Sequence, residues 1–70
     1  MKGFIRITVN GLSEDVPPSA TLADLIDIFR EMDRDLIVEY NGRFVFPQDY
    51  AAIQVAPRDR VEFIHPNFGG

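Results

Sequence analysis

The sequence predicts an α+β roll, in which a mixed sheet of four to five strands packs on one helix. Three observations support this fold class: strand-like segments flank a single helical segment, two Asn-Gly dipeptides mark tight hairpins, and 46% of the 70 residues are hydrophobic. A chain of this length forms one small domain, near the lower size limit for folding without a disulfide or metal. We expect the domain to span residues 1–65, with residues 66–70 as a flexible Gly-Gly tail.

The chain begins with a predicted hairpin. Residues 4–9 alternate with a period of two, as expected for a strand with one buried face. Three aliphatic residues share the inner face of this strand: Ile5, Ile7 and Val9. Asn10-Gly11 follows and favours a type I′ turn, because both central residues of that turn need positive φ. We therefore expect a second strand at residues 12–16.

A helix is expected over residues 21–33. The Thr21 hydroxyl can cap the first amides, and the charge of Asp24 in the first turn suits the helix dipole. Apolar residues recur at a spacing of three and four along one stripe: Leu22, Leu25, Ile26, Ile28, Phe29 and Met32. The carboxylates of Asp24, Asp27 and Glu31 lie on the other side. We interpret them as a solvated face and not as a paired general acid and base.

The second half of the chain predicts a second hairpin and a final strand. Residues 36–40 and 43–46 have strand character and are joined by the second Asn-Gly turn. Residues 48–56 are expected to be irregular or briefly helical, with three side chains filling the core from one end: Tyr50, Ile53 and Val55. A turn at 57–59 leads into the last strand, at 60–65, which Pro66 ends because proline has no N–H to donate.

The net charge of the chain indicates which classes of partner it can bind. Eleven acidic residues against seven basic ones give a formal net charge of −4. A nucleic-acid backbone would be repelled on average, whereas a basic protein partner is favoured. No segment approaches the length of a membrane span. We therefore expect a cytoplasmic protein with no nucleic-acid or membrane partner, which is monomeric when free.

The residues provide little catalytic apparatus. Because the chain has no cysteine, it has no disulfide, thiolate metal site or thiol nucleophile. We interpret His65, the only histidine, as a surface side chain at the end of a strand and not as a metal ligand. Neither a phosphate-binding glycine loop nor a nucleophile elbow occurs. The sequence therefore predicts no metal site and no catalysis by the chain alone.

The C-terminal residues Phe68-Gly69-Gly70 point to a different use. Glycine loses more conformational freedom on ordering than any other residue, so a Gly-Gly end adds no stability. Two residues without Cβ atoms can enter a narrow channel and expose the terminal carboxylate to another protein. The alternative is a frayed terminus that happens to end in glycine.

Several short motifs follow one another along the chain: Asn-Gly after the first strand, Thr21-Leu22-Ala23-Asp24-Leu25, Tyr40-Asn41-Gly42, Phe46-Pro47, Asp59-Arg60-Val61-Glu62 and the Gly-Gly end. In this order they resemble the ThiS family of sulfur carriers for thiamine biosynthesis, which have the β-grasp (ubiquitin-like) fold. The resemblance spans essentially the whole chain. Arg58 departs from it, since the family usually has glycine at that position, and with Pro57 it predicts a different turn.

The resemblance implies a carrier and not an enzyme. A ThiF-like activating enzyme would use ATP to adenylate the carboxylate of Gly70, the residue that follows Gly69. A donor such as a cysteine desulfurase would supply sulfur, and the resulting thiocarboxylate would pass it to a ThiG-like thiazole synthase. The carrier itself would bind no cofactor. The lack of cysteine agrees with this, because sulfur cannot be held here as a persulfide.

Partner binding is expected near the start of the tail. If Val61 and Phe63 face the helix, Ile64 faces outward, and an apolar patch of Phe4, Ile64 and Ile37 is expected beside Phe68. Three other functions remain open: a MoaD-like molybdopterin sulfur carrier, a ubiquitin-like protein modifier and a plain interaction module.

Overall fold

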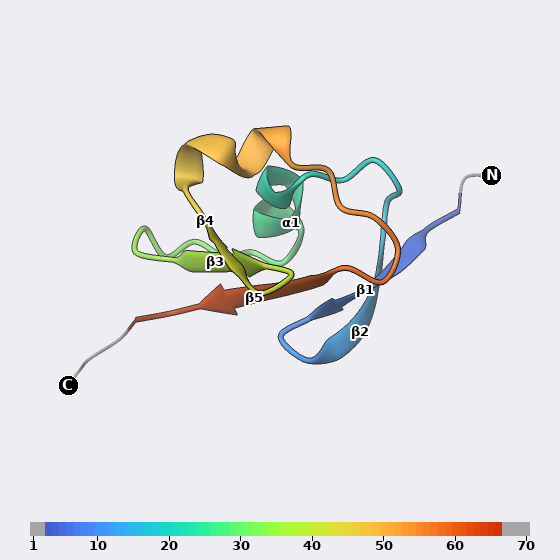
Figure 1. Cartoon of the computed structure of the whole chain (residues 1–70), viewed down its shortest axis with the longest axis horizontal. Coiled ribbons are helices and arrows are strands. Elements are labelled where there is room, and N and C mark those ends of the chain that lie inside the picture. Colours follow the sequence, from blue (N-terminus) through green and yellow to red (C-terminus); the bar gives the residue numbers. More distant parts are fainter. Residues whose placement is uncertain (1–2, 67–70) are drawn as a thin grey trace.

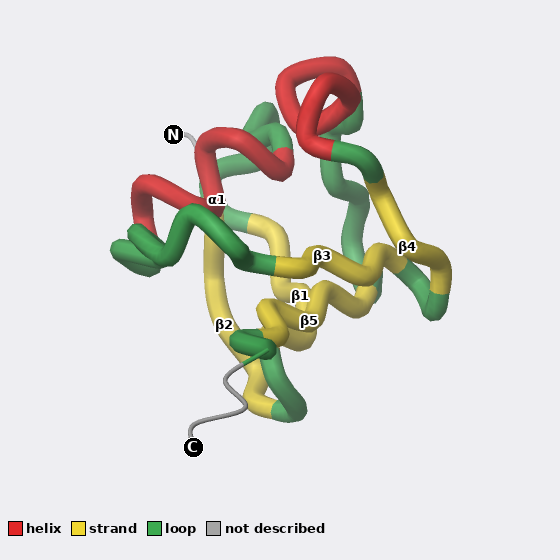
Figure 2. Tube along the Cα trace, turned by 90° about the vertical axis from the view of Figure 1, so that its left-hand side faces the viewer, coloured by secondary structure: helices red, strands yellow, loops and turns green. Residues whose placement is uncertain are grey.

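The computed structural model describes residues 3–66 and confirms the predicted roll. A five-stranded mixed sheet has the strand order β2-β1-β5-β3-β4. Figure 2 shows both helices on one side of this sheet, so its other face is free of helices in the described chain. In chain order the elements are β1 (Ile5–Val9), β2 (Leu12–Val16), α1 (Leu22–Ile28), β3 (Ile37–Tyr40), β4 (Arg43–Val45), the 3-10 helix η1 (Pro47–Ala52) and β5 (Arg60–Ile64).

Both predicted Asn-Gly hairpins are present. β1 and β2 pair antiparallel, as do β3 and β4. Asn10 and Gly11 have φ of 50° and 84°, and Asn41 and Gly42 have φ of 52° and 84°. Positive φ at both central residues is the mark of a type I′ turn, whose twist matches that of the flanking strands.

Helix α1 begins as predicted. The Asp24 N–H donates to Thr21 Oγ1 at 3.1 Å, and the Thr21 N–H donates to Asp24 Oδ2 at 2.9 Å. These two bonds form a reciprocal capping box, which satisfies two amides that the helix itself leaves without partners.

The helix ends earlier than predicted, at Ile28 and not near residue 33. Arg30 has a φ of 59°, and its N–H donates to the carbonyl of Asp27, while the Glu31 N–H donates to the carbonyl of Ile26. This pair of bonds is a Schellman motif, which closes a helix through one residue in the left-handed conformation. The prediction that Met32 lies on the buried stripe is therefore wrong, and its side chain is 86% exposed.

The core lies between the helices and the inner face of the sheet. β5 contributes Val61 and Phe63, which are buried as predicted, while Ile64 faces the other side and is half-buried. Val55 is buried after η1, and Tyr50 and Ile53 pack against the core as expected. Within residues 3–66 no helix is long and apolar enough to span a membrane.

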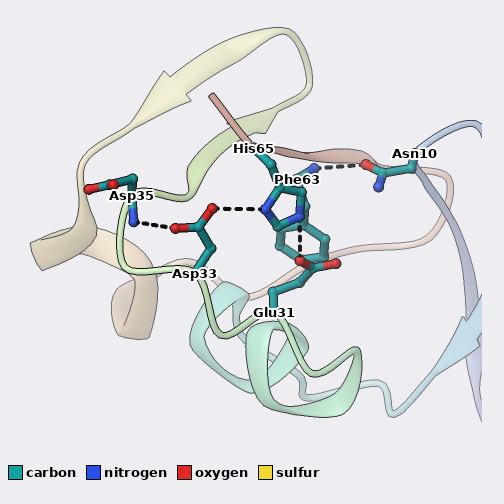
Figure 3. Close-up of polar contacts among 6 residues, drawn as sticks. All are labelled: Asn10, Glu31, Asp33, Asp35, Phe63 and His65. Carbon is teal, nitrogen blue, oxygen red and sulfur yellow. Dashed lines mark hydrogen bonds and ion pairs between the residues drawn. The ribbon is translucent and has the colours of Figure 1, made fainter. Parts of the chain in front are cut away.

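β5 is the central strand of the sheet. It pairs in parallel with β1, where Val9 lies opposite Val61, and antiparallel with β3, where Ile37 lies opposite Ile64. β1 ends while β5 continues, and the Asn10 side chain takes over the pairing: its Oδ1 accepts a hydrogen bond of 2.8 Å from the Phe63 N–H (Figure 3). The last part of β5 is thus bonded on one side by β3 and on the other by a turn side chain.

Candidate functional site

The candidate site is the end of β5, because this strand leads into the C-terminal residues. Figure 1 shows β5 ending at the opposite side of the molecule from the start of β1. The residues predicted for modification, Gly69 and Gly70, and the predicted partner contact Phe68 lie outside the described residues, so these assignments stay predictions. The described chain reaches Pro66, the second residue after the strand.

The structure corrects the predicted position of Phe4. Phe4 comes five residues before Val9, whereas Ile64 comes three residues after Val61, which lies opposite Val9. In a parallel pair these offsets add, so about eight strand positions, or about 26 Å, separate Phe4 from Ile64. The prediction that Phe4 lies beside Ile64 at the start of the tail is therefore wrong. Phe4 is 71% exposed at the far end of the sheet.

A different apolar surface extends from Ile64 across β3 to β4. Ile37 is its direct partner on β3 and shares the helix-free face of the sheet. Phe44 on β4 lies on the same face, opposite Glu39 of β3. Phe46 follows in extended backbone, and its ring meets that of Phe44 edge to face with centroids 4.8 Å apart. We call these four residues the sheet-face patch: Ile37, Phe44, Phe46 and Ile64.

Two carboxylates lie beside the sheet-face patch. Glu39 on β3 and Glu62 on β5 are direct cross-strand partners on the same face. Like charges placed directly opposite one another destabilise a sheet. Neither carboxylate forms an ion pair with a described residue. The pair therefore offers negative charge to a cation from outside the chain.

His65 follows β5 and lies between two carboxylates of the α1–β3 connection (Figure 3). Its Nε2 is 2.7 Å from Glu31 Oε1, and its Nδ1 is 3.2 Å from Asp33 Oδ2. The hydrogen bond with Asp33 and the charge of Glu31 raise the pKa of His65 above its ordinary value. Hydrogen bonds from the Asp35 N–H and from His65 lower the pKa of Asp33. The sequence placed His65 at the surface correctly but gave no sign of these partners.

Residues of two family-like motifs meet around the carboxylate of Asp59. It accepts hydrogen bonds from the Tyr40 hydroxyl, from Asn41 Nδ2 at 3.2 Å and from the Ala56 N–H at 2.8 Å. Asn41 Oδ1 in turn accepts from the Arg60 N–H at 2.8 Å. This junction fixes the β3–β4 turn to the start of β5, so these motif residues support the strand that leads to the site.

The side chains do not converge on a catalytic centre in the part of the chain described. Among residues 3–66 no group of three or more His, Asp or Glu side chains is arranged to hold a metal ion. A depression of about 310 Å³ at the end of α1 is lined by Ile26, Asp27, Arg30, Glu31 and Met32. That lining has one cation, Arg30, and two carboxylates, but no serine, threonine or histidine nucleophile. What the geometry offers is a central strand whose last residue, Ile64, lies beside an apolar surface.

Comparisons with known proteins agree with this arrangement. The thiamine biosynthesis protein ThiS from Geobacter metallireducens has a crystal structure similar to this chain, with a TM-score of 0.82, 28% sequence identity, and coverage of 94% of this chain and 100% of that one. A structure from work on molecular mimicry of SUMO in DNA repair has a TM-score of 0.62 and 17% identity over 93% of this chain and 95% of the other, and supports the fold alone. No curated protein matches the chain.

The fold is therefore the β-grasp, or ubiquitin-like, roll, with five strands and one α-helix. The ThiS family model matches residues 3–70, which include the central strand, the Asp59 junction and the Gly-Gly end. Because this match takes in all but the first two residues, the chain belongs to the ThiS family.

Proposed function

We propose that this protein is a sulfur carrier in thiamine biosynthesis, whose Gly70 carboxylate is adenylated, converted to a thiocarboxylate and used to donate sulfur for thiazole formation. Family membership over residues 3–70 is the observation that carries the proposal. The fold supports it, because the central strand β5 leads directly to the C-terminal residues. The domain supplies shape and an acyl group, and its partners supply the catalysis.

The chemistry explains why activation is needed. A carboxylate is a poor electrophile, so its oxygen first attacks the α-phosphate of ATP on the activating enzyme, which forms an acyl adenylate and releases pyrophosphate. A sulfur nucleophile then attacks the carbonyl carbon and displaces AMP. When the sulfur arrives as a persulfide, a thiol must afterwards cleave the S–S bond, leaving the thiocarboxylate and a disulfide. The chain has no cysteine, so both the persulfide and the thiol belong to other molecules.

The sheet-face patch and the pair Glu39–Glu62 define the proposed docking surface. Phe44 and Phe46 are each more than half exposed, and aromatic side chains supply much of the binding energy in protein interfaces. The two opposed carboxylates favour a partner that brings arginine or lysine beside an apolar area. We infer that the activating enzyme and the thiazole synthase use this surface in turn, and that the carrier meets them in the cytoplasm as a free monomer.

The central test is a mass measurement. The purified chain is incubated with its adenylating enzyme, ATP and a sulfur source, and the intact mass is compared before and after. The expected result is a product in which one oxygen atom has been replaced by sulfur. A variant that lacks Gly69 and Gly70 should melt at the same temperature as the wild type but gain no sulfur. Loss of stability in that variant would contradict the proposal, because the tail would then be structural.

The same assay separates the other functions. Conjugates of high molecular mass would indicate a ubiquitin-like modifier, and an unchanged mass would indicate a plain interaction module. Transfer of the sulfur to a molybdopterin precursor and not to thiazole would indicate a MoaD-like carrier.

The docking surface is tested by a matched pair of variants. Phe46→Ser should weaken binding to the activating enzyme by about 1–2 kcal/mol, roughly 5–30-fold, as expected for an aromatic contact at an interface. Phe4→Ser removes an aromatic ring that is more exposed than that of Phe46, from the far end of the sheet, and tests the earlier prediction for Phe4. Equal losses in the two variants, measured by calorimetry, would show that the sheet-face patch is not the specific contact.

A further inference from the structure

The C-terminal end leaves the domain through His65, and this residue is tied to a segment far away in the sequence. It follows the last residue of β5 and precedes Pro66, so every residue of the tail is attached through it. Its ring contacts Glu31 and Asp33, which lie 34 and 32 positions earlier in the connection after α1. These contacts of His65 with Glu31 and Asp33, which we call the link, therefore join the start of the tail to the segment that follows α1.

The geometry favours a charged ring. Both ring nitrogens face carboxylate oxygens, Nε2 toward Glu31 at 2.7 Å and Nδ1 toward Asp33 at 3.2 Å. A neutral imidazole has one N–H donor, so one carboxylate would face a lone pair. An imidazolium donates from both nitrogens and satisfies both carboxylates.

Backbone hydrogen bonds hold the Asp33 carboxylate and the main chain of Glu31. Asp33 Oδ1 accepts a hydrogen bond of 2.8 Å from the Asp35 N–H, which leaves Oδ2 for the imidazole. Glu31 is the residue whose N–H closes the Schellman motif at the end of α1. The glutamate side chain is only 18% exposed, compared with 44% for that of His65. The ring therefore binds to groups whose positions the fold fixes.

We propose that His65 is a positioning residue for the C-terminal acyl group: its imidazolium bridges Glu31 and Asp33 and thereby fixes the direction in which the chain leaves β5. The proposal rests on the proposed function, because it assumes that the residues after Pro66 deliver the reacting carboxylate. When the ring loses its proton, one of the two bonds is lost and the direction is no longer fixed.

The surroundings of the ring define the pH range of this link. Glu31 and Asp33 are the charged groups that act on it, from the α1–β3 connection. Other charged side chains of that connection, Arg30, Arg34 and Asp35, form no ion pair with the ring. β3 contributes the apolar Ile37 opposite Ile64, and the β1–β2 turn contributes the uncharged Asn10.

The sign of the pH dependence follows from the two groups. The pKa of His65 is raised, so the link is complete below the ordinary pKa of histidine and is lost as the pH rises through the raised value. The pKa of Asp33 is lowered, so the bond from its charged carboxylate to His65 is complete above the ordinary pKa of aspartate. This bond is lost as the pH falls through the lowered value. The link therefore holds between these two limits.

The first experiment measures the ring directly and needs no partner enzyme. The ¹H and ¹³C ring signals of His65 are titrated by NMR in the wild type and in three variants: Glu31→Gln, Asp33→Asn and Asp35→Asn. The wild type should titrate above the ordinary pKa of histidine, and the first two variants should titrate lower. Asp35→Asn removes a nearby charge without removing a bond to the ring, so it should leave the titration close to that of the wild type.

Two readouts test positioning. The {¹H}-¹⁵N NOE of the His65 amide should fall as the ring loses its proton, and should be low at all pH values in Glu31→Gln. With the activating enzyme, His65→Gln should lower kcat/KM for thiocarboxylate formation, where about 100-fold is the scale of loss for a misplacement of about 1 Å. The kcat/KM of His65→Gln should also lack the fall that the wild type shows as His65 deprotonates.

The outcomes separate the two proposals. A ring that titrates at or below the ordinary pKa, or one that Glu31→Gln and Asp33→Asn leave unchanged, overturns the link even if the thiocarboxylate forms. A confirmed link with His65→Gln as active as the wild type at every pH overturns the positioning role. Failure of the wild type to form a thiocarboxylate overturns the proposed function and leaves the titration result standing.

Discussion

Two arginines have backbone conformations that glycine adopts more readily. Arg30 ends helix α1 with a φ of 59°, and Arg58 has a φ of 73°. The Asp59 N–H donates to the Ala56 carbonyl at 3.1 Å and closes a turn with Pro57 and Arg58 at its centre. A type II turn has proline at its second position and a residue with positive φ at its third. Glycine is preferred at that third position. Arg58 thus takes a conformation that glycine would adopt with less strain.

Replacing this arginine should stabilise the protein. The left-handed conformation costs a non-glycine residue about 1–2 kcal/mol, whereas the extra freedom of unfolded glycine costs about 0.5–1 kcal/mol. Arg58→Gly should therefore raise the free energy of unfolding by about 0.5–1 kcal/mol in urea titrations. Arg43→Gly removes the same side chain from strand β4 and should lower the free energy of unfolding. A loss of stability in Arg58→Gly would mean that the side chain makes a contact worth more than the strain.

The Asp59 junction should make the stability depend on pH. Burial opposes the charged form of Asp59, but the hydrogen bonds from Tyr40, Ala56 and Asn41 outweigh burial and lower its pKa. The hydrogen bond to Asp59, with burial, raises the pKa of Tyr40 to about 12. The stabilisation from Asp59 is complete above the ordinary pKa of aspartate and is lost as the pH falls through the lowered value.

Tyr40→Phe tests this junction. It should lower the free energy of unfolding by about 1–2 kcal/mol at neutral pH, the range for a lost hydrogen bond to a charged group. The variant should also lose less stability than the wild type between neutral and acidic pH, because Asp59 is then less stabilised in its charged form. Tyr50→Phe is the control, since the pKa of Tyr50 is raised by burial alone. Equal effects of the two substitutions would argue against the junction.

At the scale of the element, helix α1 depends on its ends. It has seven residues, too few for a stable helix in isolation. The capping box at Thr21 and the packing of Leu22 and Leu25 therefore decide whether it forms. Thr21→Ala should lower the free energy of unfolding by about 1 kcal/mol in urea titrations, while Thr21→Ser keeps the hydroxyl and should cost little. An equal loss in both variants would show that the methyl group and not the cap matters.

The elements predicted well from sequence are those set by local rules. Both hairpins follow from Asn-Gly, whose conformation is fixed by the two residues themselves. The start of α1 follows from Thr21 and Asp24, three positions apart. The end of α1 was missed because arginine gives no signal for the left-handed conformation that Arg30 adopts. The apolar Met32 then continued the helical pattern past the true end.

At the scale of the whole molecule, the sheet face combines apolar surface with unpaired charge. Glu39 and Glu62 lie opposite one another without a described cation, in a chain of net charge −4. The double variant Glu39→Gln, Glu62→Gln should gain about 0.2–1 kcal/mol of stability, because a like-charge pair is removed. It should bind the activating enzyme more weakly and with less dependence on salt.

A matched variant controls for net charge. Asp27→Asn, Asp49→Asn removes two charges from the helical side of the molecule and should leave the binding affinity nearly unchanged. The measurements are urea unfolding and calorimetry at two salt concentrations. Equal losses of affinity in both double variants would show that the partner responds to the overall charge and not to the Glu39–Glu62 pair.

The site was predictable in part. Alternation along β5 correctly predicted that Val61 and Phe63 face inward and Ile64 outward. This alternation is a property of the single strand and does not depend on which strands pair with it. The position of Phe4 was not predictable, since it depends on how far β1 and β5 are offset, and the sequence does not encode a parallel register locally. The partners of His65 were missed for the same reason, because they lie more than 30 positions away.

The central place of β5 also has a mechanical consequence. A strand at the edge of a sheet peels away one hydrogen bond at a time when its end is pulled, but β5 is bonded to β1 on one side and β3 on the other. A pull directed along this strand loads the bonds on both sides together, in shear. An enzyme that draws the end of the chain into a narrow channel would therefore move the folded domain as a unit and would not unfold it.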